Sequence, residues 1–354
     1  LIPAVGKAWG RYTNLGGPAT WWNQDLRTQV NDRINFTVQR ELRAGFKSDV
    51  TFFMNYGKSL PYSKKMNMSD PELGYTHKAV LNQAVANPFY RYMTPDTFPG
   101  VLRNQVTVSR GSLLSPYPQY TGLTQSNTAG PRNRYRALQM RVQRAYSSGA
   151  SVLWAYNYNR ERNEAFFNAP DEFAGQFTFI PTNNPRHRMT TAGTYDLPFG
   201  KGRPLLANPH PVVQAVLGGW STSSILVFNS GAFLRFGGLD VIGEGSPKID
   251  NPTPERRFKT TEMFRVQTPY TPRLNPWQYE GVTGPKYWNL DTTLSKYFNI
   301  TERYQIEFKM EAYNLTNSFI WNDPNMTVTS SQFGRSNNQA NRGREFQYTI
   351  RVHF

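Results

Sequence analysis

Strict alternation of apolar and polar residues constrains the fold of this chain more than any other feature. The last nine residues alternate without a break. The apolar members are Phe346, Tyr348, Ile350, Val352 and Phe354, and the polar members are Gln347, Thr349, Arg351 and His353. Side chains of a β-strand point alternately to its two faces, so this pattern predicts a strand with one apolar face. About nine residues suffice for a tilted strand to cross a bilayer. A half-buried strand of a soluble β protein would show the same pattern.

The same period of two recurs along the chain. It is found at 33–39, 50–56, 138–143, 152–158 and 304–312. Short turn sequences separate neighbouring runs at 44–45, 147–149 and 299–302, which predicts antiparallel hairpins. Together these segments predict an all-β chain of roughly ten strands, each about 9–15 residues long.

The run at 304–312 separates its two faces clearly, because Glu307, Lys309 and Glu311 alternate with apolar side chains. Such a strand has water on one side and hydrocarbon, or a protein core, on the other. The residues expected to face lipid are Tyr304, Ile306, Phe308, Met310, Tyr348, Ile350 and Val352. The residues expected to face a wet interior are Glu307, Lys309, Glu311 and Arg351.

Composition agrees with strands that cross a membrane better than with helices that do so. Hydrophobic residues make up 38% of the chain and aromatic residues 14%. No window approaches the run of about 18 apolar residues that a transmembrane helix needs. A membrane barrel needs lipid-facing residues only at every second position, and aromatic girdles at its two rims add further rings.

Long connections alternate with the short turns. Segments 58–103, 111–132, 159–185 and 235–285 are rich in Pro, Gly and Asn. Soluble sandwiches usually have connections of about 4–6 residues, whereas membrane barrels have tight turns at one end and long extracellular loops at the other. Short helices are predicted at 79–87 and 211–217. No linker divides the chain, so 1–354 is treated as one segment.

The sequence shows no residue pattern that is typical of a catalytic, cofactor-binding or metal-binding site. Cysteine is absent and the histidines at 77, 187, 210 and 353 have no ligand spacing. We therefore expect no catalytic, cofactor-binding or metal-binding residue and no enzyme. The net charge of +16 is spread over the whole chain, so we expect most of these charges to be solvated on polar faces. A basic surface of this kind is also compatible with contact to anionic lipopolysaccharide, an anionic solute or a polyanion, and nucleic acid is not expected as a partner.

Several short blocks occur in a fixed order over about residues 130–354. They are Arg186-His187-Arg188, Tyr195 to Gly202, Gly218-Gly219-Trp220, Asn229-Ser230-Gly231, Gly284-Pro285, Asn289-Leu290-Asp291, Leu294-Ser295-Lys296, Thr301-Glu302-Arg303, Glu311 to Asn317 and Phe333-Gly334. In this order they resemble the barrel of Oar-like TonB-dependent outer-membrane receptors. Residues 1–129 are similar only loosely, to preceding strands of that barrel.

The resemblance implies a transmembrane antiparallel β-barrel of about 22 strands, of which 1–354 would be the C-terminal part. The chain shows no plug, TonB-binding segment or signal peptide, so an upstream part or another polypeptide would supply the remaining strands, the plug and the contact with TonB. Phe354 would end the closing strand. The protein would lie in the bacterial outer membrane, in contact with lipid and lipopolysaccharide.

The implied function is uptake of a large or scarce solute whose identity stays open. One alternative is a structural or adhesive barrel that binds partners or surface polysaccharide through basic aromatic loops. Another is a secreted β protein that binds polyanions. The residues expected to make the loop contacts are Tyr90, Arg91, Tyr92, Tyr117, Tyr120, Tyr270 and Trp277.

Overall fold

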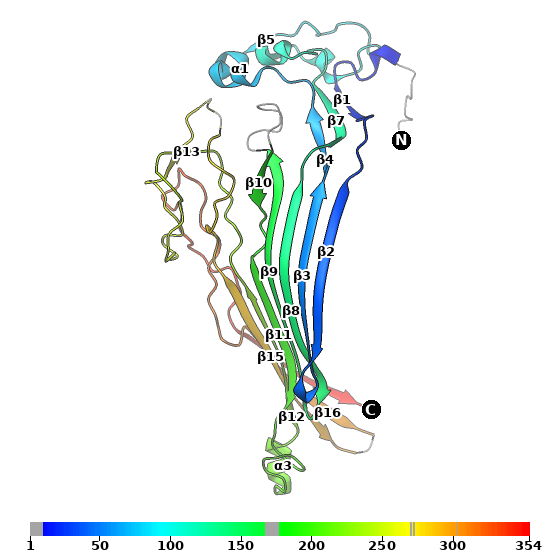
Figure 1. Cartoon of the computed structure of the whole chain (residues 1–354), viewed down its shortest axis with the longest axis vertical. Coiled ribbons are helices and arrows are strands. Elements are labelled where there is room, and N and C mark those ends of the chain that lie inside the picture. Colours follow the sequence, from blue (N-terminus) through cyan, green and yellow to red (C-terminus); the bar gives the residue numbers. More distant parts are fainter. Residues whose placement is uncertain (1–9, 167–176, 270, 272, 302) are drawn as a thin grey trace.

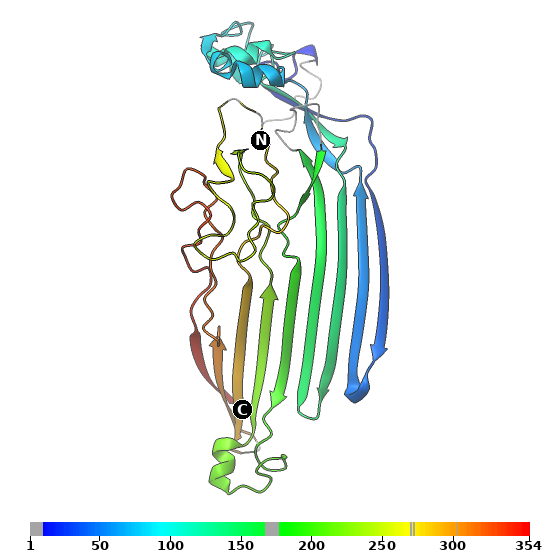
Figure 2. The same ribbon diagram turned by 60° about the vertical axis from the view of Figure 1, so that its left-hand side comes forward.

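A curved antiparallel wall dominates the structure (Figures 1 and 2). The computed structural model describes residues 10–166, 177–269, 271, 273–301 and 303–354. Within these residues ten strands form one sheet in the order β17-β16-β15-β12-β11-β9-β8-β3-β2, and β10 pairs with β9 beside this path. The strands are β2 (Val30–Glu41), β3 (Phe46–Lys58), β8 (Asn133–Ser147), β9 (Ala150–Phe166), β10 (Phe177–Pro181), β11 (His187–Asp196), β12 (Trp220–Asn229), β15 (Tyr287–Asn299), β16 (Gln305–Tyr313) and β17 (Glu345–His353).

The hairpins predicted from short turns are present. β2 pairs with β3, β8 with β9, and β15 with β16, all antiparallel. Ser148 and Gly149 have φ values of 51° and 77°, the backbone conformation of a two-residue hairpin turn that matches the twist of its strands. The wall has tight turns at one end and long connections at the other, with the helix α3 (Pro211–Leu217) at the tight-turn end (Figure 1).

Two of the sequence-based expectations need adjustment. The helix predicted at 79–87 is wrong in extent, because α2 ends after Lys78–Leu81 and Ala84–Ala86 form the strand β5. The preceding helix α1 (Pro71–Thr76) begins where the Asp70 carboxylate accepts a hydrogen bond from the Glu72 amide at 2.9 Å. Tyr304 lies just before β16 because its carbonyl accepts hydrogen bonds from Ile300 and Thr301 and so closes the turn. The predicted helix at 211–217 is confirmed as α3.

A first outer unit stands above the wall at the end of β3 and β8 (Figures 1 and 2). Its sheet contains β1 (Pro18–Trp22), β7 (Gly122–Ala129) and β4 (Pro61–Lys65), and β5 pairs with β6 (Thr107–Ser109). The 3-10 helices are η1 (Gly10–Tyr12), η3 (Val101–Asn104) and η4 (Arg110–Leu114), while η2 (Arg43–Gly45) belongs to the β2–β3 turn. The buried side chains Phe98, Leu102 and Asn87 hold this unit together.

A second outer unit is formed by the connections β12–β15 and β16–β17, at the same end of the wall. It includes β13 (Leu239–Val241) and β14 (Phe264–Val266), which form a small hairpin. Its core, here called the outer core, comprises Leu234, Phe236, Leu239, Phe258, Met263, Phe264, Val282 and Phe333. These long connections therefore pack as an ordered body with its own buried aromatic cluster.

The described wall has two edges. β2 pairs only with β3, and β17 pairs only with β16, among the residues that the structure describes. None of the described helices is long and apolar enough to span a bilayer.

Candidate functional site

The two faces of the wall continue from strand to strand in register. On one face Val50 pairs with Met140, Met140 with Tyr156, Tyr156 with Met189, and Met189 with Phe228. We call this the apolar face and its opposite the polar face. Because the period of a strand is two, a slip of one residue at any ladder would mix the faces. The shared register therefore makes one apolar band across the strands.

The residues expected to face lipid lie together on the apolar face at its β16–β17 end. Ile306 pairs with Val352, Phe308 with Ile350, and Met310 with Tyr348. Ile350 is 72% exposed and Tyr348 is 63% exposed. Phe308 is half-buried, with its ring edge-on to Trp220 at 6.1 Å. Tyr304 and Phe354, which flank these strands, are also exposed.

The residues expected in a wet interior lie on the polar face. Glu307 is buried and its carboxylate accepts a hydrogen bond from the Tyr297 hydroxyl at 3.0 Å. The same carboxylate lies 3.6 Å from the Arg351 guanidinium and 3.3 Å from the His353 ring. Lys309 and Glu311 form an ion pair at 3.0 Å. These charges compensate one another within the sheet, so they form a structural polar cluster at its edge.

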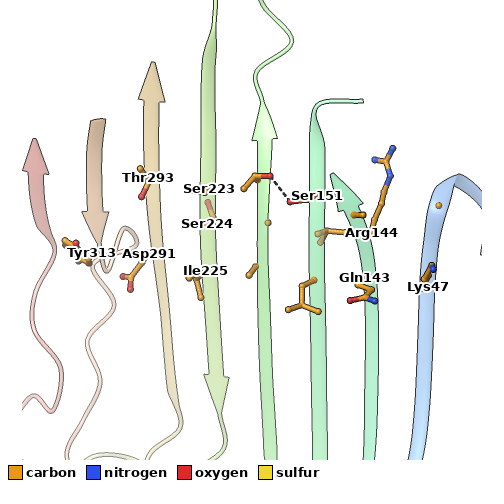
Figure 3. A pocket seen from close by; sticks show the side chains of 17 residues that line it. Lys47, Gln143, Arg144, Ser151, Ser223, Ser224, Ile225, Asp291, Thr293 and Tyr313 are labelled. Atoms are coloured by element: carbon orange, nitrogen blue, oxygen red, sulfur yellow. Dashed lines mark hydrogen bonds between the residues drawn. The ribbon is translucent and has the colours of Figure 1, made fainter. Parts of the chain in front are cut away.

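Hollows lie over the polar face, and two of them extend over several strands. The larger, about 740 Å³, is lined by residues of seven strands, from β3 to β16 (Figure 3). Side chains that line it include Lys47, Gln143, Ser151, Thr194, Ser223 and Asp291. The second, about 490 Å³, is lined from the same face by residues such as Gln39, Gln139 and Arg188. Both hollows lie on one side of the sheet, so the polar face is the concave one and the apolar face is the convex one.

Neutral hydroxyl groups account for much of the polarity of the larger hollow. The Ser151 and Thr194 hydroxyls, which line it, are 2.7 Å apart across β9 and β11 (Figure 3). Elsewhere on the polar face the Ser221 and Ser295 hydroxyls are 2.9 Å apart across β12 and β15. Hydroxyls exchange hydrogen bonds with water and with many polar solutes without selecting a charge. This surface is suited to contact with water or a polar partner.

The second outer unit contains a buried arginine stacked on tryptophan. The Arg273 guanidinium lies 3.5 Å from the ring centre of Trp277, and Arg235 lies over the same ring at 4.5 Å. Arg273 donates hydrogen bonds to the carbonyls of Asn275 and Phe236 at 2.7 and 2.8 Å. Burial, with a smaller contribution from Arg235, lowers the pKa of Arg273 to about 10. The guanidinium therefore stays charged at neutral pH, held by the ring and the carbonyls.

Ion pairs attach the second outer unit to the wall. The Glu280 carboxylate pairs with Arg186 at the start of β11, and with Arg162 of β9 at 3.4 Å. The sequence marked Arg186 only as part of a block, and neither Glu280 nor Arg273 was predicted. Glu280 lies 94 residues from Arg186, and Arg273 needs the carbonyl of Phe236, 37 residues away, besides its near neighbour Asn275. The content of Tyr, Arg and Asn in the long loops was the signal that marked the region.

The expected loop contacts fall into separate places. Tyr90, Arg91, Tyr92, Tyr117 and Tyr120 belong to the first outer unit, and Trp277 belongs to the second. Tyr92 and Tyr117 are 55% and 50% exposed, and the Arg91 guanidinium lies 5.3 Å from the Tyr90 ring centre. Tyr120 and Trp277 are half-buried. Tyr270 lies outside the described residues.

No group of three or more His, Cys, Asp and Glu side chains within the described ranges is arranged to hold a metal ion. Several of the described carboxylates instead pair with cations or accept hydrogen bonds from backbone groups. Asp240, for example, accepts hydrogen bonds from the Thr268 hydroxyl and from Arg265, and these bonds lower the pKa of its carboxyl group. They tie together the two strands of the β13–β14 hairpin.

Comparison with known proteins identifies the class. A family model described as an outer membrane beta barrel domain matches residues 3–347. The chain belongs to this family, and the protein is located in the bacterial outer membrane. Its all-β wall is therefore a transmembrane antiparallel β-barrel segment with long extracellular loops.

No curated protein matches the chain. Among solved structures, the outer membrane transporter YddB from Escherichia coli is 10% identical with a TM-score of 0.45, covering 96% of this chain and 34% of YddB. The ferric-catecholate import receptor Fiu from Escherichia coli is 10% identical with a TM-score of 0.42, covering 94% of this chain and 28% of Fiu. BauA, the ferric preacinetobactin receptor from Acinetobacter baumannii, is 10% identical with a TM-score of 0.38, covering 92% of this chain and 29% of BauA. The chain thus spans about a third of the length of these proteins or less.

Proposed function

We propose that the chain forms part of the wall of an Oar-like TonB-dependent transporter that takes up a large or scarce solute. The observation that carries the proposal is the single curved sheet of ten described strands with a concave polar face. Barrels of this breadth, about 22 strands when complete, enclose an interior wide enough for a plug. The family match places such a wall in the outer membrane.

In this proposal the convex apolar face contacts lipid and the concave polar face lines the interior. Tyr304, Ile306, Phe308 and Met310, with Tyr348, Ile350 and Val352, contact acyl chains or headgroups. The water-filled interior is lined by Glu307, Lys309, Glu311 and Arg351. Each carboxylate pairs with a cation of this set, so none of the four charges is isolated. The basic outer loops contact lipopolysaccharide or the arriving solute, since loops held by a rigid scaffold commonly make such contacts.

The two edges of the described wall support a larger barrel. Hydrocarbon does not hydrogen-bond an unpaired strand edge, and each unpaired backbone group in lipid costs several kcal/mol. We therefore propose that β2 and β17 each pair with a further strand, supplied by an upstream part of the same protein or by another polypeptide. The same source would supply the plug and the segment that contacts TonB.

Energy-dependent uptake tests the proposal. Cells with and without the gene would be grown in a rich extract, and the loss of solutes from the medium followed by mass spectrometry. We expect at least one solute to be taken up only when the gene is present, and this uptake to stop when TonB is deleted or a protonophore collapses the inner-membrane gradient. Equal uptake by both strains for every solute would refute the transport proposal.

The exposed aromatics of the first outer unit favour adhesion as a second candidate function. Tyr92 and Tyr117 are half or more exposed, and Tyr92 directly follows the cation–π pair of Arg91 and Tyr90 in the sequence. Exposed aromatic faces of this kind can stack on sugars. For an adhesive protein, Tyr92→Ala with Tyr117→Ala would abolish binding of cells to immobilised polysaccharide, while deletion of TonB would have no effect. For a transporter, the same pair would leave polysaccharide binding unchanged.

A further inference from the structure

The connection between β11 and β12 contains a helix with an uncovered apolar side. In α3, Val212 and Val216 are 65% and 60% exposed, and Leu217 is 49% exposed. Val212 and Val216 lie on one side of the helix because residues four apart face the same way, and Leu217 follows at its last position. Gln214 lies on the other side, where its side-chain oxygen accepts a hydrogen bond from the Lys201 amide at 2.7 Å. The apolar side therefore points away from the rest of the connection.

Lys296 fixes the C-terminal end of α3 to the wall. Its ammonium lies 2.6 Å from the carbonyl oxygens of Ala215 and Gly218, and Lys296 is only 3% exposed. The Trp220 indole N–H donates to the Val216 carbonyl at 2.8 Å. The last carbonyls of a helix lack partners within the helix and carry partial negative charge, so a lysine there is favourable. Among the described residues no carboxylate is paired with Lys296, so these carbonyls are its principal partners.

The position of Lys296 in the register shows which side of the wall holds α3. Trp220 pairs with Lys296, Lys296 with Phe308, and Phe308 with Ile350. All four side chains belong to the apolar face. The helix is therefore attached from the convex side of the wall, not from the concave interior, and it lies at the tight-turn end (Figures 1 and 2). In outer-membrane barrels this end is the periplasmic one.

The charge of the connection also suits a membrane surface. Residues 197–219 contain no acidic residue, and of their two cations Arg203 pairs with Asp196 of β11 at 2.9 Å, whereas Lys201 has no carboxylate partner among the described residues. Further apolar side chains are exposed beside the helix, with Leu205 at 49% and Leu206 at 45%. A short segment that joins an apolar side to basic residues binds at the boundary between headgroups and acyl chains, where anionic lipid phosphates attract the cations.

We propose that α3 is an interfacial anchor that lies in the periplasmic leaflet of the outer membrane. Val212, Val216 and Leu217 enter the acyl boundary of the phospholipids, while Lys201 meets their headgroups. Lys296 is a positioning residue, since it holds the helix against the lipid side of the wall. The inference rests on the assignment of the apolar face to lipid and adds a membrane contact outside the spanning strands.

Spin labels test this placement, because the chain has no cysteine of its own. Single cysteines would replace Val216 on α3, Asn208 in the same connection, and Ile350 on the apolar face. The labelled protein would be reconstituted in vesicles of phosphatidylethanolamine and phosphatidylglycerol. We expect the Val216→Cys label to collide several-fold more with dissolved oxygen, which enters lipid, than with a water-soluble nickel chelate. The Asn208→Cys label should show the reverse preference.

The three labels separate the possible failures. Nickel accessibility at Val216→Cys equal to that at Asn208→Cys would place α3 in water and overturn the anchor, even with Ile350→Cys in lipid. A Val216→Cys label shielded from both reagents would mean a protein contact and would also overturn it. A water-exposed Ile350→Cys label would instead refute the lipid assignment of the apolar face, on which the proposed function depends.

A variant of Lys296 tests the positioning role. Lys296→Met keeps a long side chain but removes the three donors, so we expect the Val216→Cys label to gain nickel accessibility several-fold. The Ile350→Cys label in the same variant reports whether the wall is still folded and should not change. An unchanged label at both positions would show that Lys296 does not hold the helix in the interface. Lys201→Gln is the matched variant. It should weaken the preference of the protein for vesicles that contain anionic phosphatidylglycerol, while the Val216→Cys label stays in lipid.

Discussion

Replacement of Ile350 by arginine is expected to destabilise the folded wall by about 2–4 kcal/mol where the residue lies near the bilayer midplane. Ile350 is 72% exposed on the convex face and pairs with Phe308 of β16. A guanidinium at this position would lie among acyl chains with no acceptor within reach. Urea unfolding of the protein in phospholipid vesicles, followed by the loss of protease resistance, would measure the change.

The polar neighbour Gln347 supplies the matched control for this substitution. Gln347 lies on the opposite face of the same strand and pairs with Glu311 of β16. An arginine there would remain in water beside a carboxylate, so Gln347→Arg should leave the free energy of unfolding nearly unchanged. Equal destabilisation by Ile350→Arg and Gln347→Arg would show that the two faces of β17 do not differ in environment and would contradict the lipid assignment.

The strands of the wall could be predicted from the sequence because they depend on alternation and turn residues, which are local features of the chain. Alternation at 33–39 and 50–56, with a turn between them, fixes both the β2–β3 hairpin and the face of each side chain. The same reasoning gave β8–β9 and β15–β16. The helix at 79–87 failed because its small apolar residues suit more than one conformation, and pairing of Ala84–Ala86 with β6 decided for a strand.

The outer units and the α3 attachment could not be predicted from local pattern. Phe236, Phe258 and Phe333 come together from three irregular stretches that have no period of 2 or 3.6. Arg273 likewise needs carbonyl groups that only the folded loop brings together. The attachment through Lys296, in contrast, could have been suspected from the sequence. This lysine occupies an apolar position between Leu294 and Phe298, and a charge that interrupts a lipid-facing stripe calls for a specific partner.

The packed outer core holds the exposed groups at the extracellular end of the barrel in fixed positions. Loops that each bend independently would offer only transient contacts, whereas the second outer unit is packed within and is fastened to β9 and β11 through Glu280. A packed unit keeps exposed groups such as Arg235 in fixed positions relative to the wall. Recognition of a solute or a surface at this end would therefore depend on the stability of this buried core.

Truncation of Phe258 to alanine should accordingly unfold the second outer unit while the wall stays folded. Phe258 is fully buried and its ring lies 5.1 Å from Phe236 and 5.3 Å from Phe333. Removal of a buried phenylalanine side chain typically costs about 3–5 kcal/mol because a cavity remains. The chain beside it carries Arg256, Arg257 and Lys259, so trypsin can cut once the unit opens. Cleavage of the protein in intact membranes should accelerate by about 100-fold or more, since its rate follows the population of the open form.

Phe319 is the matched control, because it lies in the β16–β17 connection but is 52% exposed. Its ring contacts Trp321 at 4.7 Å on the surface of the unit, so Phe319→Ala leaves no closed cavity. We expect its tryptic cleavage rate to stay within a few-fold of that of the unchanged protein. If Phe258→Ala were also cut at that rate, the outer core would not be what holds these connections together. If Phe258→Ala lost the protease-resistant wall as well, the outer unit and the barrel would fold as one cooperative body, and the core would contribute to membrane assembly as well as to recognition.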